Sequence, residues 1–178
     1  MQAEPRLTPT SFIVLGLLEL SGEASPYALK QLVAGSVGHF WTLHHAQLYT
    51  ETERLAGAGY VTETREEGGR RRKLYALTAR GREALERWRR APTDEVAEIR
   101  EPALLKLFFG ADPAELAASQ LPAHRRQLEE YERIRDTMPE SVPEGPRLAL
   151  ENGIWHERSS IAFWEDLAGD RRRRTPSG

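Results

Sequence analysis

Hydrophobic positions recur along most of the chain at the spacing of helices. After Pro9, residues 10–20 are apolar almost all round, which predicts a helix that is buried on several sides. Ser25 followed by Pro26 predicts the start of a second helix, because a hydroxyl group caps the helix and proline suits its first position. The chain therefore opens with two closely spaced helices.

A third helix is expected at residues 45–58, followed by a pair of short strands. The buried face of this helix is predicted to consist of Leu48, Thr52 and Leu55. Residues 60–64 and 74–77 are rich in β-branched or aromatic side chains, and the double glycine at 68–69 supplies the backbone torsions of a hairpin tip. The pattern predicts a helix followed by a β-hairpin.

A fourth helix is expected to begin after Thr78 and to end at Trp88, with Ala84, Leu85 and Trp88 returning to the core. The composition of the chain changes at Pro92, which is the predicted domain boundary. The expected organisation is therefore one domain at 8–91, a second at 92–169 and a disordered basic tail at 170–178.

The second domain is predicted to contain helices alone. A short apolar helix at 104–109 precedes a long one that starts after Asp112 and could run to Met138, with Pro122 expected to kink or divide it. Residues 147–168 form the last predicted helix. These long helices carry few apolar residues, so we expect them to pack against a second copy of the chain.

Composition excludes several classes of function. The 178 residues are 39% hydrophobic and 29% charged, as in ordinary globular proteins. The chain has no cysteine, which removes disulfides and thiolate zinc sites and is typical of the cytoplasm. Its longest apolar run is far shorter than the roughly 20 residues of a membrane span, and no signal peptide is visible. No phosphate loop, nucleophile elbow or metal motif indicates an enzyme or a cofactor.

The net charge of −2 is unevenly distributed. Residues 1–90 carry 13 Lys or Arg against 10 Asp or Glu, a net charge of +3, whereas residues 91–178 carry 12 against 17, a net charge of −5. Four consecutive cations, Arg70 to Lys73, lie at the predicted hairpin tip. A helix followed by a basic hairpin is typical of a winged helix, in which the helix enters the major groove of DNA and the wing contacts phosphate.

The expected fold class is therefore mainly α with a small β-hairpin wing, and the outward face of the third helix supplies candidate contacts to DNA. An amide such as Gln47 pairs with adenine, and the hydroxyls of Tyr49 and Thr50 donate to phosphate. The candidate DNA-binding residues are His45, Gln47, Tyr49, Thr50, Arg54, Arg70, Arg71, Arg72 and Lys73. The plainer alternatives are that this helix face is merely solvated, and that the basic run at 70–73 is a charged edge that prevents strand pairing between molecules.

Two further groups of side chains are candidates for binding a metal ion or a small molecule. His39, His44 and His45 are close in sequence, but no complementary ligand set accompanies them, so no metal site is predicted. Trp41, Trp88 and Trp155 are candidates for an aromatic effector pocket or a dimer contact, against the alternative that they are ordinary core residues.

Over most of its length the chain resembles the PadR-like transcriptional regulators. The similar segments are residues 8–20, Tyr27-Ala28-Leu29-Lys30, Trp41, Gln47-Leu48-Tyr49, Gly59-Tyr60-Val61, Arg70-Arg71-Arg72-Lys73-Leu74-Tyr75 and Leu77-Thr78-Ala79-Arg80-Gly81. The chain departs from the family pattern at Thr50 and Thr52 in the third helix, where a proline and a leucine are common.

The resemblance implies a homodimer with an N-terminal winged helix-turn-helix and a C-terminal helical dimerisation domain. It further implies a repressor that binds a pseudo-palindromic operator in duplex DNA and is released by an apolar or aromatic small molecule. Two other functions remain open from the sequence. A winged helix can serve as a protein-interaction module, and the chain could bind small molecules without contacting DNA.

Overall fold

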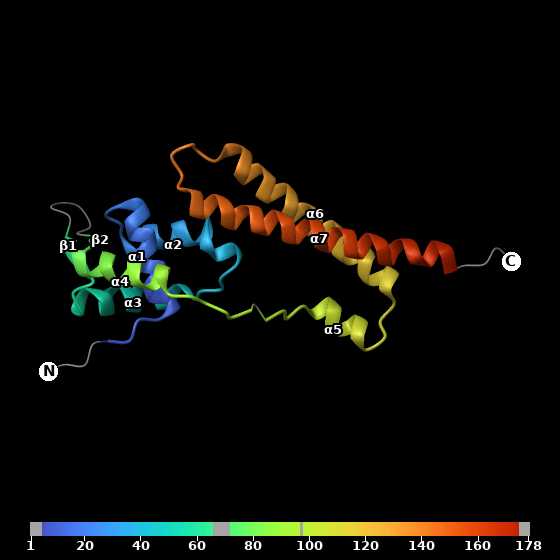
Figure 1. Ribbon diagram of the computed structural model, residues 1–178, viewed down its shortest axis with the longest axis horizontal. Helices are drawn as coiled ribbons and strands as arrows, with labels where there is room; N and C mark the ends of the chain where they lie inside the picture. The colour runs from blue at the N-terminus through green and yellow to red at the C-terminus, as the bar shows by residue number, and fades with distance from the viewer. Residues whose placement is uncertain (1–4, 66–71, 97, 175–178) are drawn as a thin grey trace. The chain divides into compact units, whose positions relative to one another are not determined.

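The computed structural model describes residues 5–65, 72–96 and 98–174, without the side chains of His45 and of residues 170–174. Figure 1 shows the course of the chain. The elements are α1 (Pro9–Ser21), α2 (Pro26–Ala34), the short 3₁₀ helix η1 (Val37–His39), α3 (His45–Gly57), β1 (Val61–Arg65), β2 (Lys73–Leu77), α4 (Ala79–Arg90), α5 (Pro102–Phe108), α6 (Pro113–Thr137) and α7 (Glu144–Arg174).

The chain divides into two compact units, Met1–Glu95 and Val96–Gly178. Across the described residues, no helix combines the length and the apolar character that a membrane span requires. Each unit has its own arrangement of helices, and only the first contains strands among the residues described.

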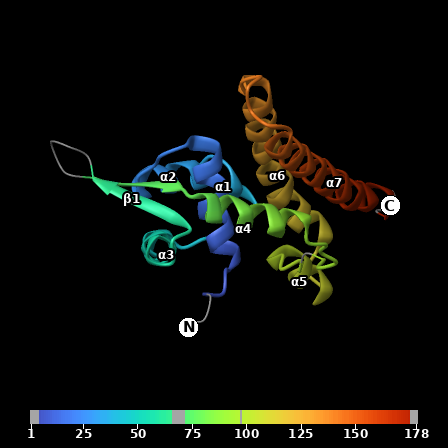
Figure 2. The ribbon, with the colours of Figure 1, turned by 60° about the vertical axis from the view of Figure 1, so that its left-hand side comes forward.

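The first unit packs α1 to α4 around one hydrophobic core, with the β1–β2 hairpin at its side (Figure 2). The hairpin is antiparallel, and Val61 pairs with Leu77 at its inner end while Arg65 pairs with Lys73 at its outer end. The fully buried side chains of this core include Val14, Leu15, Leu29, Leu48, Leu55 and Tyr75. The predicted winged-helix arrangement is confirmed.

Local capping explains where the helices begin. The hydroxyl of Ser25 accepts a hydrogen bond from the backbone N–H of Ala28 at the start of α2. The hydroxyl of Thr78 likewise accepts from Gly81 at the start of α4. Trp88 near the end of α4 is half exposed and stacks on Phe12 at 4.7 Å between ring centroids, so it does not return to the core as predicted.

Gly81 lets α4 approach the strand that precedes it. A Cβ atom at this position would lie 2.2 Å from the carbonyl oxygen of Tyr60 and 2.8 Å from a methyl group of Leu77. The carbonyl of Tyr60 also accepts hydrogen bonds from the backbone and the hydroxyl of Thr78. The packing of α4 on the hairpin therefore requires a residue without a side chain at Gly81.

In the second unit, α6 and α7 form an antiparallel helical hairpin, and α5 packs on α6 (Figure 1). Trp164 of α7 is buried with Ala117 of α6, and Gly153 faces the ring of Tyr131. The helix α6 continues through Pro122 as one element and is not divided there, although a proline removes one backbone hydrogen bond.

The last helix is longer at both ends than the sequence predicts. It begins at Glu144 and extends to Arg174, so the residues from 170 to 174 are helical and not part of a disordered tail. Residues 175–178 lie outside the described part of the chain.

The close approach at Gly81 gives a stability prediction. Gly81→Ala should lower the free energy of unfolding by about 1–3 kcal/mol, because the added methyl group overlaps backbone atoms. The control is Gly16→Ala, since a Cβ at Gly16 meets nothing within 4 Å. Alanine stabilises a helix by about 1 kcal/mol relative to glycine, so this variant should not lose stability. Urea titrations of both variants measure the difference. A Gly81→Ala protein as stable as the wild type would contradict the packing described.

Candidate nucleic-acid interface

The helix α3 has one buried face and one exposed face. Leu48, Thr52 and Leu55 have no solvent-exposed surface, as the helical spacing predicts. Thr52 can occupy the core because its hydroxyl donates to the carbonyl of Leu48 at 2.5 Å. Gln47 and Tyr49 are exposed on the two flanks of this buried stripe, and Thr50 is exposed opposite it. The core thus determines which side chains α3 presents to a partner.

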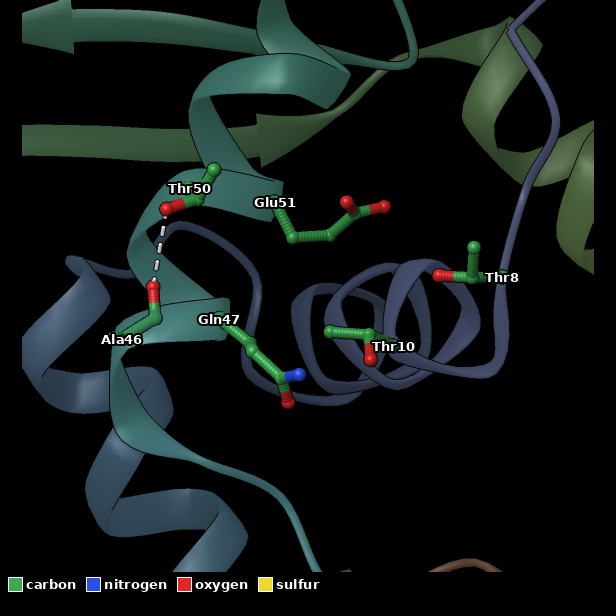
Figure 3. Close-up of a pocket in the computed structure, with 6 residues that line it drawn as sticks. All are labelled: Thr8, Thr10, Ala46, Gln47, Thr50 and Glu51. Atoms are coloured by element: carbon green, nitrogen blue, oxygen red, sulfur yellow. Dashed lines mark hydrogen bonds between the residues drawn. The ribbon is translucent and has the colours of Figure 1, made fainter.

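Gln47 lies in a shallow groove between the start of α3 and the start of α1. The groove has a volume of about 330 Å³ and is lined by Thr8, Thr10, Ala46, Gln47, Thr50 and Glu51 (Figure 3). The side-chain oxygen of Gln47 accepts a long hydrogen bond of 3.4 Å from the backbone N–H of His44. Such a bond is weak, so the amide can exchange it for a base edge.

Thr50 and His45 complete the candidate set on α3. The hydroxyl of Thr50 donates to the carbonyl of Ala46 at 3.2 Å, and its oxygen remains exposed on the helix face (Figure 3). His45 is the first residue of α3, and its side chain lies outside the described part of the structure.

Arg54 is held inside the first unit. Its guanidinium donates two hydrogen bonds to the carboxylate of Glu51, at 2.6 and 2.8 Å, and a third to the hydroxyl of Ser11 at 3.1 Å. Ser11 itself donates to Glu51 at 2.5 Å, which joins α1 to α3. These contacts make Arg54 a support for α3, and because about one third of its side chain is exposed, its contact with DNA stays a prediction.

The environment of Glu51 favours its charged form. Burial alone would raise the pKa of this carboxyl, but hydrogen bonds from Arg54 and Ser11 outweigh it, so the pKa is lowered. A lowered pKa in the folded state means that Glu51 adds stability above the pKa it has in the unfolded chain. This contribution is lost as the pH falls through the folded-state pKa.

Removing the charge of Glu51 should therefore weaken the fold. Glu51→Gln is expected to lower the free energy of unfolding by about 1–3 kcal/mol. This lies between the contributions of exposed and of buried ion pairs, because the Arg54 side chain is about one third exposed. Below about pH 4.5, the stability difference between wild type and variant should shrink. Urea titrations at several pH values test this. As a control, Glu86→Gln removes an exposed pair with Arg90 and should change little. A pH-independent difference would contradict the assignment.

A cluster of charged and polar side chains surrounds Lys73 at the outer end of the described strands. The ammonium of Lys73 lies 3.0 Å from a carboxylate oxygen of Glu53 on α3 and 3.3 Å from one of Glu63 on β1. Glu63 also accepts a hydrogen bond from the hydroxyl of Tyr75 at 3.1 Å. We call Glu53, Glu63, Lys73 and Tyr75 the Lys73 cluster. Hydrogen bonds to Glu53 and Glu63 raise the pKa of Lys73, so it stays protonated.

A second groove, of about 490 Å³, lies between α2, α3 and the wing. It is lined by Ser25, Pro26, Tyr27, Tyr49, Glu53, Arg72, Lys73 and Tyr75. Tyr49 is 44% exposed and Arg72 is exposed, so both reach solvent beside this groove. Of the other predicted wing contacts, Arg70 and Arg71 lie outside the described residues.

The three candidate tryptophans are all partly exposed. Trp41 precedes α3 and Trp88 lies near the end of α4, and both belong to the first unit. Trp155 lies on α7 in the second unit and is 73% exposed. Within the described ranges, no group of three or more histidine and acidic side chains is arranged to hold a metal ion.

Comparisons with known proteins agree with this geometry. The transcriptional regulator PadR-like family matches residues 14–87, and the C-terminal domain of the virulence activator alpha family matches residues 99–169. A probable transcriptional regulator of Mycobacterium tuberculosis is 30% identical to the chain, over 85% of the chain and 93% of the relative. The chain belongs to the PadR-like family of transcriptional regulators.

Two further likenesses concern PadR itself. The negative transcriptional regulator PadR of Bacillus subtilis is 27% identical to this PadR-like regulator, over 88% of the chain and 93% of the relative. The crystal structure of that protein with operator DNA has a TM-score of 0.79 at 24% identity, over 89% of this chain and 96% of the other. Its structure with p-coumaric acid has a TM-score of 0.72 at 22% identity, over 92% and 97%.

Some residues that shape this interface of the PadR-like regulator escaped the sequence reasoning. Glu51 and Arg54 are three apart on a helix, a spacing that signals an ion pair, but nothing marks Ser11 as their third member. Glu53 and Lys73 are 20 residues apart and meet only because the hairpin folds back on α3. Pairs of this kind require the tertiary structure.

Proposed function

We propose that this PadR-like regulator is a sequence-specific repressor that binds operator DNA as a homodimer and is released by a small molecule. The exposed face of α3 beside the wing carries the proposal, because the buried stripe behind it fixes the orientation of Gln47, Tyr49 and Thr50. The proposal involves no catalytic step and no cofactor. The proposal places the protein in the cytoplasm.

In the proposed complex, α3 enters the major groove and the wing lies along the phosphate backbone. Gln47 reads an adenine through its amide, and Tyr49 and Thr50 donate to phosphate or base edges. Arg72 contacts phosphate, together with Arg70 and Arg71, which lie outside the described residues. His45 is a further candidate because it is the first residue of α3, two residues before Gln47.

The homodimer is supported by the sparse core of the second unit. Among the residues described there, the buried apolar side chains are Ala103, Ala117, Tyr131, Ile154 and Trp164. Large apolar side chains on α7, namely Leu148, Trp155 and Phe163, are exposed in the single chain. A second copy would cover them, and it would place two α3 helices on two half-sites of a pseudo-palindromic operator.

Release by an effector is supported by the structure of B. subtilis PadR with p-coumaric acid. The effector proposed for this chain is apolar or aromatic, and its candidate contacts are the exposed Trp41, Trp88 and Trp155. An effector that binds better to one arrangement of the helices shifts the population toward it. The angle between the two winged helices then changes and the half-site spacing no longer fits the operator.

The proposed reading of DNA can be tested at Gln47. Gln47→Ala should cost roughly 1–3 kcal/mol of binding to the operator and little on random DNA, because one base contact is lost. Removing Arg70, Arg71 and Arg72 together should instead weaken binding to all sequences about equally. Electrophoretic retardation of a selected operator and a scrambled duplex, at several salt concentrations, measures both.

The salt dependence provides the control for this experiment. Each phosphate contact contributes about 0.9 to the slope of log affinity against log salt, so the arginine variant should have a shallower slope than Gln47→Ala. If Gln47→Ala lowers the affinity for both DNAs equally, Gln47 does not contact a base specifically. A wild-type protein that retards no DNA at low salt would rule out the proposed function.

The dimer can be tested at Trp155. Trp155→Glu should give monomers or insoluble protein, because the partner would have to bury an unpaired charge. His156→Glu is the matched control, since His156 is exposed on the same helix but is already polar. Sedimentation at micromolar concentration distinguishes the states. A wild-type chain that sediments as a monomer, or a Trp155→Glu chain that remains a dimer, contradicts the proposed interface.

A further inference from the structure

Lys73 joins two elements that both belong to the proposed DNA-binding surface. It is the first residue of β2, where the chain leaves the hairpin tip. Its ammonium contacts Glu53 on the exposed face of α3 at 3.0 Å and Glu63 on β1 at 3.3 Å. A single cation thus connects the outer end of the wing with the recognition helix.

Among the described residues, Lys73 and Arg65 together face two carboxylates. Arg65 lies 3.8 Å from the second carboxylate oxygen of Glu63, so two cations meet two carboxylates. If Lys73 turned toward a phosphate, Glu53 would lose its counter-charge on the face that approaches DNA. A carboxylate left unpaired beside phosphates repels them, so this exchange is unfavourable.

The rest of the wing is held at other points. The backbones of Ala24 and Tyr75 exchange two hydrogen bonds, at 2.9 and 3.0 Å, which attach the middle of β2 to the turn before α2. The hydroxyl of Thr64 donates to Glu23 at 2.6 Å, which attaches β1 to the same turn. Among these links, the contact of Lys73 with Glu53 is the one that reaches α3.

We propose that Lys73 is a positioning residue that holds the wing at a fixed angle to α3 through Glu53, and that it does not neutralise phosphate. The inference rests on the proposed function, because the angle matters only if wing and helix contact one duplex. It divides the basic run into two roles. Arg72 and its neighbours contact the backbone, and Lys73 sets where that contact falls relative to the bases read by α3.

The two roles differ in how binding responds to salt. A residue that neutralises a phosphate contributes about 0.9 to the slope of log affinity against log salt, and a residue paired inside the protein contributes nothing. Arg72→Met should therefore reduce the slope by about 0.9 for each subunit. Lys73→Met should keep the wild-type slope and still weaken operator binding, by about tenfold, because the wing is no longer preorganised.

A second measurement needs no DNA. In the isolated protein, Lys73→Met and Glu53→Gln should each speed amide hydrogen exchange in β1 and β2, and the double variant should exchange no faster than Lys73→Met alone. Arg72→Met is the matched control at the neighbouring position and should leave this exchange unchanged. Thermal unfolding should confirm that all four proteins fold.

The outcomes separate this inference from the proposed function. If Lys73→Met reduces the salt slope as much as Arg72→Met does, Lys73 contacts phosphate and the positioning role is wrong, while DNA binding stands. If exchange in the wing does not change in Lys73→Met, the role is also wrong. If the wild-type protein binds no DNA, the proposed function fails, and the exchange experiment still decides whether Lys73 holds the wing.

Discussion

The burial of one stripe of α3 controls what the first unit can present to a partner. Leu48 and Leu55 are completely buried, and burying a leucine contributes about 1.5–3 kcal/mol. Rotating α3 to expose a different face would bring these side chains into water. The exposed positions of Gln47, Tyr49 and Thr50 are therefore a consequence of the core, as is the side of the unit on which the wing lies.

Polar contacts refine the position that burial sets. Glu51 and Arg54 attach α3 to Ser11 on α1, and Glu53 attaches the same helix to Lys73 of the wing. Two acidic residues on one helix thus connect it to α1 and to the wing. A DNA-reading surface needs this support, because contacts to base edges and to phosphates must fit one duplex at the same time.

The parts of the fold that depend on local sequence could be predicted, and those that depend on distant contacts could not. Ser25, Thr78 and Asp112 cap their helices as expected, because a cap depends on neighbours within three residues. The spacing of Leu48 and Leu55 predicted the buried face because both residues lie on one helix, where a separation of seven residues returns to the same side. The commitment of Arg54 could not be predicted, since Ser11 is 43 residues away.

The arrangement of α3 and wing on two half-sites can be measured most directly by hydroxyl-radical footprinting of a selected operator. The account predicts two protected patches related by two-fold symmetry, with centres about 10–10.5 base pairs or a multiple of this apart, and exposed backbone between them. Each patch should lose its outer protection when Arg70, Arg71 and Arg72 are replaced. A single patch without symmetry, or protection that the wing variant leaves unchanged, would contradict the account.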